Sequence, residues 1–174
     1  MHQTLLSLAG LLMVTLLSFA QQQAARRAQR QAVQEEVRQM AVGIAKQSVE
    51  VIRARAFDNE SVSGTPPVGQ LTDPSNFPSG KDCEAFGGGD RCDAVEDFHE
   101  MTPARQEGQV PGGTFAFQME VDVHYVDADM NRTTSKTERK EVTIRVQDIR
   151  GSNSSPRLSQ PVVLTEVIGY HGAS

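Results

Sequence analysis

The sequence predicts an α+β fold in which one long N-terminal α-helix, hydrophobic and then amphipathic, is followed by a small antiparallel β-meander. No proline occurs before Pro66, and between Val33 and Ala56 apolar or small side chains recur at three- and four-residue steps, the period of an α-helix. In the last third of the chain the period changes to two, which is typical of strands. A helix followed by a group of strands, without alternating units, favours an α+β plan.

Residues 1–57 are expected to form one near-continuous helix, of which residues 1–25 are the hydrophobic membrane or filament-core segment. This segment contains no Asp, Glu, Lys or Arg, and its apolar run at 5–20 approaches the length that spans a bilayer. The whole helix would be roughly 80 Å long, so its own domain is too small to cover it and lipid or further copies must cover the N-terminal half. The expected assembly side chains are Leu5, Leu6, Leu8, Leu11, Leu12, Val14, Leu16, Leu17 and Phe19.

Two simpler interpretations of the N-terminal segment stay open. Residues 18–20 (Ser-Phe-Ala) form a tolerable cleavage site for a secretory signal, although no Lys or Arg precedes the apolar run and the helical pattern continues beyond it. A plain membrane anchor fits the length of the run. The basic cluster at 26–30 would then favour a cytoplasmic location for the chain that follows it, whereas a disulfide-containing domain belongs outside the cytoplasm. The topology is therefore open.

Residues 58–174 are expected to form a globular, β-rich domain that packs against the amphipathic half of the helix. Asp58-Asn59, followed by Ser-Val-Ser-Gly-Thr-Pro-Pro, predicts the end of the helix. Residues 58–112 are rich in Pro and Gly, and we expect a long irregular loop over the domain. A short motif at 95–98 (Val-Glu-Asp-Phe) is expected to pin this loop.

Cys83 and Cys92 lie nine residues apart within the Gly-rich loop. In a short loop of an exported chain, two cysteines most simply form one disulfide. Metal binding is the weaker interpretation, because two thiolates need two further ligands and only His99 is close in sequence.

Three strands are predicted, at residues 114–126, 138–147 and 161–170. The first two flank a polar, turn-rich segment and are expected to pair as an antiparallel hairpin. The side chains that alternation places on the inward faces are Phe115, Phe117, Met119, Val121, Val123 and Tyr125 in the first strand and Val142, Ile144 and Val146 in the second.

Composition argues against several functional classes. The formal net charge is -5 and the pI is near 5.4, so no nucleic-acid partner is predicted. The chain has no Trp and only two Tyr, which leaves no aromatic platform for bases or sugars. The four histidines are scattered and form no recognisable catalytic arrangement with Ser, Cys or Asp, so no catalytic residue is assigned and the chain is not expected to be an enzyme.

One loop has the ligand spacing of a calcium site. Asp127, Asp129, Asn131 and Glu138, together with Thr133 and Ser135, occupy positions 1, 3, 5, 12, 7 and 9 of an EF-hand loop. However, Arg132 stands at position 6, where Gly makes the sharp turn, and predicted strands flank the loop instead of helices. A solvated hairpin turn is therefore the default, and calcium is the only cofactor that the sequence raises.

Several segments resemble a known family. The order of helix, irregular segment and strands is that of type IV pilins and type II secretion pseudopilins. The segments AKQSVEVIRARAFDNE (45–60), CDAVEDFHEMTP (92–103), FAFQMEVDVHYVDADMN (115–131) and RKEVTIRVQ (139–147) are similar to minor pilins of the MSHA type and to secretion pseudopilins. The resemblance covers about 130 residues in plan and about 45 in recognisable segments, none of which is catalytic.

The N-terminus departs from the pilin pattern. Prepilins carry a short basic leader that ends in Gly, followed by Phe-Thr-Leu-Ile-Glu, whereas this chain begins MHQTLL and has Leu5 at the position of the glutamate. The sequence is then expected to be either a mature chain or a divergent relative. Some minor pseudopilins lack the same glutamate.

The resemblance implies a structural subunit of a type IV pilus-like filament or pseudopilus, assembled through the hydrophobic helix. Its expected partners are further copies or other pilin-like subunits, with the inner membrane as the location before assembly and an extracellular filament or periplasmic pseudopilus afterwards. The alternative is a single-pass membrane-anchored or secreted extracytoplasmic binding protein that does not form filaments.

Overall fold

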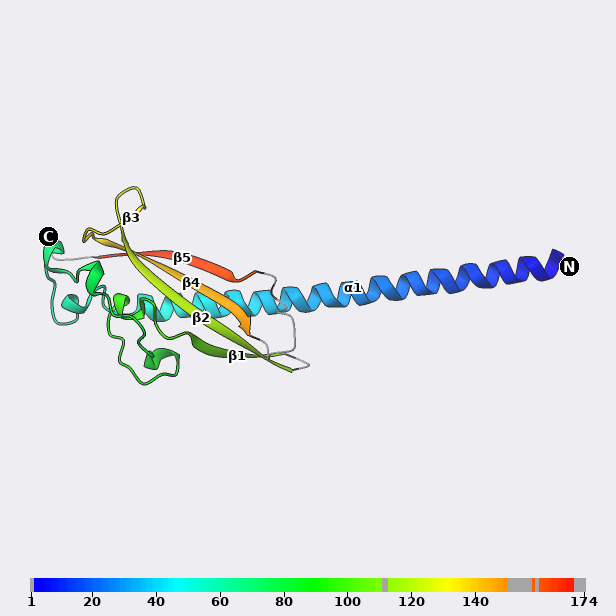
Figure 1. The fold of residues 1–174 in the computed structure, drawn as a ribbon, viewed down its shortest axis with the longest axis horizontal. Coiled ribbons are helices and arrows are strands. Elements are labelled where there is room, and N and C mark those ends of the chain that lie inside the picture. Colours follow the sequence, from blue (N-terminus) through cyan, green and yellow to red (C-terminus); the bar gives the residue numbers. More distant parts are fainter. Residues whose placement is uncertain (1, 111–112, 150–157, 159, 171–174) are drawn as a thin grey trace. The chain divides into compact units, whose positions relative to one another are not determined.

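The structure is a computed structural model. It describes the backbone of residues 2–110, 113–149, 158 and 160–170, and side chains throughout these ranges except at 2–11, 14–16, 20, 109–110 and 113–114. The elements, shown in Figure 1, are α1 (His2–Arg53), the 3-10 turns η1 (Asn59–Ser61), η2 (Val68–Gln70), η3 (Pro74–Asn76), η4 (Glu84–Phe86) and η5 (Val95–Phe98), and the strands β1 (Ala104–Val110), β2 (Gly113–Val126), β3 (Arg132–Thr133), β4 (Arg139–Ile149) and β5 (Val162–Gly169).

The single long helix is confirmed, with an earlier end than the sequence pattern predicts. α1 spans 52 residues without interruption and ends at Arg53, four residues before the expected end at Phe57. The chain turns away because Ala56 forms a parallel bridge with Ala94, in which the Ala56 amide donates to Asp93 and the Val95 amide donates to the Ala56 carbonyl. A contact with a distant segment therefore sets the helix end.

The chain divides into two compact units, residues 1–37 and 38–174, and the boundary falls inside α1. In the first unit the described backbone is helical throughout. In the second unit the rest of α1 packs against the sheet through small and branched side chains at three- and four-residue steps: Ala41, Ala45, Val49 and Ile52 are buried there. This unit therefore has the α+β plan that the sequence predicts.

The sheet is antiparallel throughout, with strand order β1-β2-β4-β5 and β3 paired to β2. The predicted alternation is confirmed, since all the inward side chains expected in the two hairpin strands are buried. The irregular-loop prediction for 58–112 is wrong at 104–110. These residues form β1, whose register with β2 places Ala104 opposite Met119 and Gly108 opposite Phe115.

Residues 57–103 cover one end of the domain through short 3-10 turns. Phe57, Leu71 and Tyr125 form a buried cluster there, against which Phe77 and Tyr170 pack. Below this cluster, the motif at 95–98 forms η5, and all four of its residues are buried. The expected pinning role of this motif is therefore consistent with its position.

The predicted disulfide is present. It joins Cys83 to Cys92 with the two Cα atoms 5.6 Å apart, and both side chains are fully buried. Two glycines between them have no substitute. Gly87 has a φ of 96°, in the left-handed region, and a Cβ on Gly88 would collide with the backbone of Asp82.

The disulfide yields a stability prediction. Replacing both cysteines (Cys83→Ala with Cys92→Ala) should lower the free energy of unfolding by about 2–3 kcal/mol, because the unfolded chain regains the entropy of an open loop. Urea denaturation followed by circular dichroism measures the change. Reductant should destabilise the wild type and leave the double variant unchanged. Two titratable thiols in unreduced, denatured wild type would contradict the assignment.

Candidate functional site

The helical unit exposes large apolar side chains. Leu12, Met13, Leu17 and Phe19 have exposed fractions of 56%, 70%, 64% and 61%. Such exposure is uncommon for clustered apolar residues of a soluble monomer and marks an interaction surface. Of the predicted assembly side chains, those of Leu5, Leu6, Leu8, Leu11, Val14 and Leu16 lie outside the described residues.

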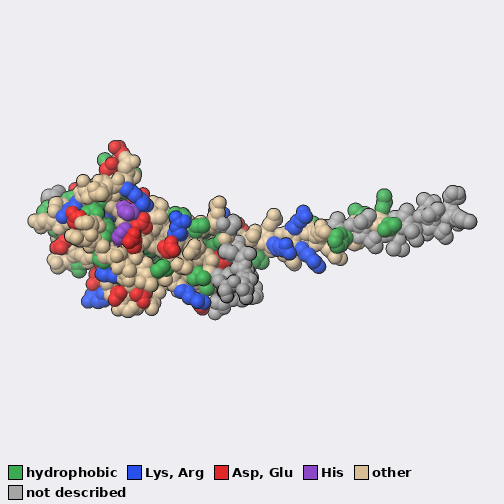
Figure 2. Space-filling view, in the orientation of Figure 1, with side chains coloured by type: hydrophobic (Ala, Val, Ile, Leu, Met, Phe, Trp, Pro, Cys, Tyr) green, Lys and Arg blue, Asp and Glu red, His purple; other side chains and the backbone are tan. Residues whose placement is uncertain are grey.

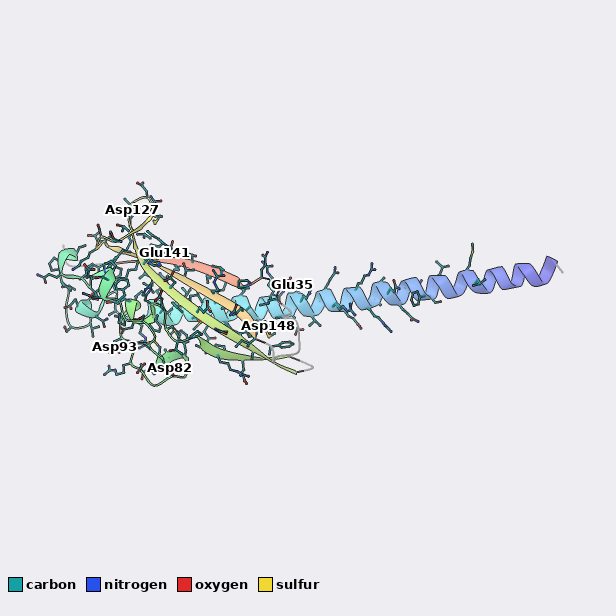
Figure 3. The ribbon with its side chains drawn as sticks, in the orientation of Figure 1. Glu35, Asp82, Asp93, Asp127, Glu141 and Asp148 are labelled. Carbon is teal, nitrogen blue, oxygen red and sulfur yellow. A yellow bond between two sulfur atoms is a disulfide. The ribbon has the colours of Figure 1, made fainter. Side chains whose placement is uncertain are left out.

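Charged side chains follow the apolar run on the same helix. Arg26, Arg27 and Arg30 are exposed, and Glu35 and Glu36, the first acidic residues of the chain, are exposed one to two turns later. Figure 2 shows the arginines standing out from the helix, and Figure 3 labels Glu35. In the described part of the chain, none of these five side chains forms an ion pair.

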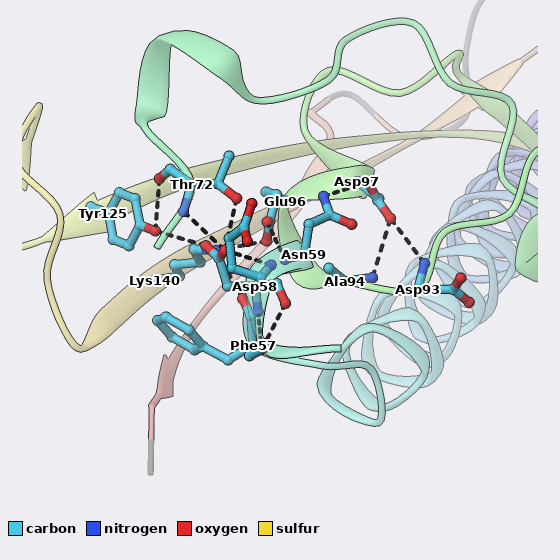
Figure 4. Close-up of polar contacts among 12 residues, drawn as sticks. Phe57, Asp58, Asn59, Thr72, Asp93, Ala94, Glu96, Asp97, Tyr125 and Lys140 are labelled. Carbon is cyan, nitrogen blue, oxygen red and sulfur yellow. Dashed lines mark hydrogen bonds and ion pairs between the residues drawn. The ribbon is translucent and has the colours of Figure 1, made fainter. Parts of the chain in front are cut away.

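A buried ionic cluster lies at the end of α1, and we call its four side chains Lys140, Asp58, Glu96 and Tyr125 the Lys140 cluster (Figure 4). Lys140 Nζ lies 2.7 Å from Asp58 Oδ2 and 2.6 Å from Glu96 Oε2, and all three side chains are fully buried. The ammonium group donates a third bond, of 2.8 Å, to the Phe57 carbonyl. Tyr125 donates its hydroxyl to Asp58 Oδ2 at 2.9 Å.

Four segments of the chain supply this cluster. Asp58 follows the helix end and also caps η1, where its Oδ1 accepts from the Glu60 amide. Glu96 comes from η5, and Lys140, the second residue of β4, lies directly opposite Tyr125 of β2. Sequence reasoning missed the cluster. The alternation of β4 could have revealed it: Lys140 lies an even number of residues from the buried side chains of this strand, so it also points inward.

The electrostatics of the two carboxylates differ. Burial alone would raise the pKa of Asp58, but its hydrogen bond and ionic contact with Lys140, helped by hydrogen bonds from Thr72, lower that pKa to about 2. For Glu96 burial dominates and raises the pKa, although Lys140 and the Asn59 amide oppose it. Burial and the neighbouring Asp58 charge raise the pKa of the Tyr125 hydroxyl, so Tyr125 acts as a hydrogen-bond donor.

Aromatic rings enclose the ammonium group. Lys140 Nζ lies 4.6 Å from the ring centroid of Phe57, 5.0 Å from that of Tyr125 and 5.1 Å from that of Phe77. The negative faces of such rings attract a cation, and desolvation strengthens that attraction. Together with the three hydrogen bonds, the rings replace the water that the ammonium group loses on burial.

A third buried carboxylate, Asp97, organises the neighbouring loop. Its Oδ2 accepts from the amides of Asp93 and Ala94, and its Oδ1 accepts from Asn59 and Lys81. Burial works to raise the pKa of Asp97, but these hydrogen bonds lower it. Among the described residues, every buried side-chain nitrogen or oxygen has a hydrogen-bond partner. The Lys140 cluster and Asp97 therefore tie the helix end, the disulfide loop and the sheet together, which is a structural role.

The outer face of the sheet carries a polar groove of about 610 Å³. Figure 2 shows histidine side chains close to acidic and basic ones on this face. Asp122 lies at the centre of the groove, 2.8 Å from His124 Nε2, 3.2 Å from His99 Nδ1 and 3.4 Å from Arg132 Nη1. The Val123 amide also approaches His99 Nδ1, at 3.2 Å. His124 is thus on the outward face, as alternation predicts, and the network links β2, β3 and the segment after η5.

The proposed calcium ligands lie on the loop after β2, where Figure 3 labels Asp127. Asp127 Oδ1 accepts from the amides of Asp129 and Asn131, which is the pattern of a hairpin turn closed by a carboxylate, and these hydrogen bonds lower its pKa. Asp127 and Glu138 line one shallow hollow. Within the described residues, no three His, Cys, Asp or Glu side chains are placed to hold a metal ion together.

Comparison with known proteins gives no relative: no protein-family model, curated protein or solved structure matches this chain. Where the structure describes side chains, no helix combines the length and the apolar character needed to cross a bilayer.

Removing the buried cation should destabilise the domain strongly. Lys140→Met leaves two carboxylates buried without a cation, and we expect a loss of about 3–5 kcal/mol in the free energy of unfolding at pH 7. Lys46→Met, an exposed change of the same kind on α1, should alter it by less than about 0.5 kcal/mol. Adding Asp58→Asn and Glu96→Gln to Lys140→Met should recover part of the loss. Urea denaturation measures all four proteins, and a loss below about 1 kcal/mol for Lys140→Met would refute the role.

The lowered pKa of Asp58 predicts a pH dependence. The ionised carboxylate contributes stability that is fully present above the unfolded-state pKa of about 4 and is lost as pH falls through about 2. Asp58→Asn should therefore be less stable than wild type by about 1–3 kcal/mol at pH 7, and this difference should shrink between pH 4 and pH 2. Thermal unfolding across this range tests it, with Asp129→Asn as the exposed control. A difference that stays constant down to pH 2 would contradict the mechanism.

Proposed function

We propose that this chain is a structural subunit of a pilus-like filament or pseudopilus that assembles through its N-terminal helix. One observation carries the proposal: the part of the 52-residue α1 that ends at Val37 lies in a unit of its own, in which large apolar side chains are exposed. An apolar helix surface of this kind needs a partner. Copies of the same helix supply one, and each side-by-side contact gains about 25 cal/mol per Å² of apolar surface removed from solvent.

Three further observations support this proposal. The second unit has a helix packed on an antiparallel sheet, the arrangement that the resemblance to pilins implies. Its buried disulfide suits an oxidising, extracytoplasmic compartment. Its ionic network is enclosed and structural, which fits a rigid building block better than a catalyst. In this proposal, the subunit resides in the inner membrane before assembly and then in an extracellular filament or periplasmic pseudopilus, beside identical or other pilin-like subunits.

A second candidate is a single-pass anchored protein that forms no filament. The observation in its favour is the position of the arginines at 26–30, which follow the apolar run as basic residues do at the edge of a membrane. This candidate needs lipid around the helix and no contact between copies. The two candidates therefore differ in whether copies of the helix meet.

A single substitution separates them. Leu17→Arg puts a charge into an apolar helix contact at several kcal/mol per subunit, so the concentration at which filaments form after detergent removal should rise at least about a hundredfold. Gln22→Arg, an exposed position on the same helix, should leave assembly close to wild type. Sedimentation and negative-stain microscopy give the readout, with circular dichroism as the folding control. If wild type stays monomeric at every concentration and yet binds vesicles, the filament proposal is wrong and the membrane-anchored protein is favoured.

A further inference from the structure

The charged residues of the helical unit form two patches of opposite sign: a basic patch (Arg26, Arg27 and Arg30) and an acidic patch (Glu35 and Glu36). At 3.6 residues per turn, the centres of the two patches lie about 180° apart around the helix axis. They are also separated along the axis by about eight residues, or about 12 Å. The helix therefore presents a positive face and a negative face that are offset from each other.

Neither patch is neutralised within its own helix. Residues three or four positions apart are neighbours on a helix, and no acidic residue lies within that distance of any of the three arginines. Arg26 and Arg30 are themselves four apart, which is an unfavourable like-charge pair. Glu35 and Arg38 are three apart, yet no ion pair joins them in the described structure. Both patches are thus open to a partner of opposite charge.

The exposed apolar residues follow the same two faces. With the same helical period, Leu12 and Phe19 fall on the side of the basic patch and Leu17 falls on the side of the acidic patch, whereas Met13 lies between the two. All four are more than half exposed. Each face therefore combines an apolar part with a charged part, and the two faces are complementary in charge.

We propose that the acidic patch of one copy docks on the basic patch of the next copy, in a parallel arrangement with an axial offset of about 12 Å. This inference rests on the proposed filament function and adds the contact that sets the register. Because the two patches lie on opposite faces, a two-fold dimer cannot pair both of them. An assembly of any length keeps one free patch at each of its two ends. The contact is therefore heterologous, and further copies can be added.

The offset is compatible with apolar contact. The run at 5–20 is about 24 Å long, so a shift of about 12 Å keeps roughly half of it against the neighbouring copy. The apolar part then supplies attraction without a defined register, and the charged patches select one register. Exposed charges of this kind contribute little individually, and salt screens them within about 10 Å at 0.1 M ionic strength. Several of them repeated in every subunit can still decide the alignment.

The test uses two full-length charge-reversal variants. Glu35→Lys with Glu36→Lys makes both faces basic, and Arg26→Glu with Arg27→Glu and Arg30→Glu makes both faces acidic. Each variant alone should leave at least about ten times more protein unsedimented than wild type at low salt. An equimolar mixture should assemble with both variants in the pellet, because unlike faces alternate. At about 0.5 M NaCl each variant alone should move back towards wild type. Glu84→Lys with Glu107→Lys makes the same change in net charge as Glu35→Lys with Glu36→Lys, but on exposed positions of the other unit, and should assemble normally.

Three results would overturn the inference. The patches do not meet if each patch variant assembles like wild type, or if the mixture sediments no better than its components. The proposed filament function would still stand in that case, provided that wild type forms filaments. A basic-patch variant that assembles normally but loses binding to phosphatidylglycerol vesicles, compared with phosphatidylcholine vesicles, would assign the arginines to lipid. Wild type that never assembles would overturn both the register and the filament.

Discussion

The second unit depends on one buried cation. Among the described residues, Lys140 is the only positive charge in contact with the two fully buried carboxylates Asp58 and Glu96, which lie 82 and 44 residues earlier in the chain. Burying a carboxylate without a partner is far more unfavourable than burying a hydrogen-bonded pair, so the three groups can be enclosed only together. Asp58 holds the segment that follows α1, and Glu96 holds η5. The position of the disulfide loop on the sheet follows from these two attachments.

The two units differ in whether their apolar side chains are covered. In residues 38–174 the helix buries its stripe of small residues against its own sheet, and the polar groups that are enclosed with it find partners inside the domain. In residues 1–37 the described apolar side chains other than Val37 stay exposed, and the charged side chains form no ion pair. Residues 38–174 thus bury their apolar stripe within their own unit, whereas residues 1–37 expose apolar side chains that a partner could cover. This contrast supports the proposed assembly more directly than any single residue does.

Much of the fold was predictable because it follows from local periodicity. The long helix, the two hairpin strands and the Cys83–Cys92 disulfide are all as expected. The missed features are those that only tertiary contacts create. β1 carries mostly polar residues and a glycine, so its strand character comes from pairing with β2. The helix end at Arg53 comes from the bridge between Ala56 and Ala94. The inward position of Lys140 was visible in the phase of β4, but its partners were not, because spacing along the chain does not show which distant carboxylates converge.

The composition of the Lys140 cluster also limits how early during synthesis the domain can fold. Asp58 and Glu96 are both synthesised well before Lys140. Before Lys140 is present, burying them would place two unpaired negative charges in an apolar interior. A nascent chain that stops short of β4 therefore lacks the counter-charge for its own core, and contacts of such large sequence separation form slowly. The ionic core can therefore close only after β4 has been synthesised. Until then Asp58 and Glu96 have no cation with which they can be buried.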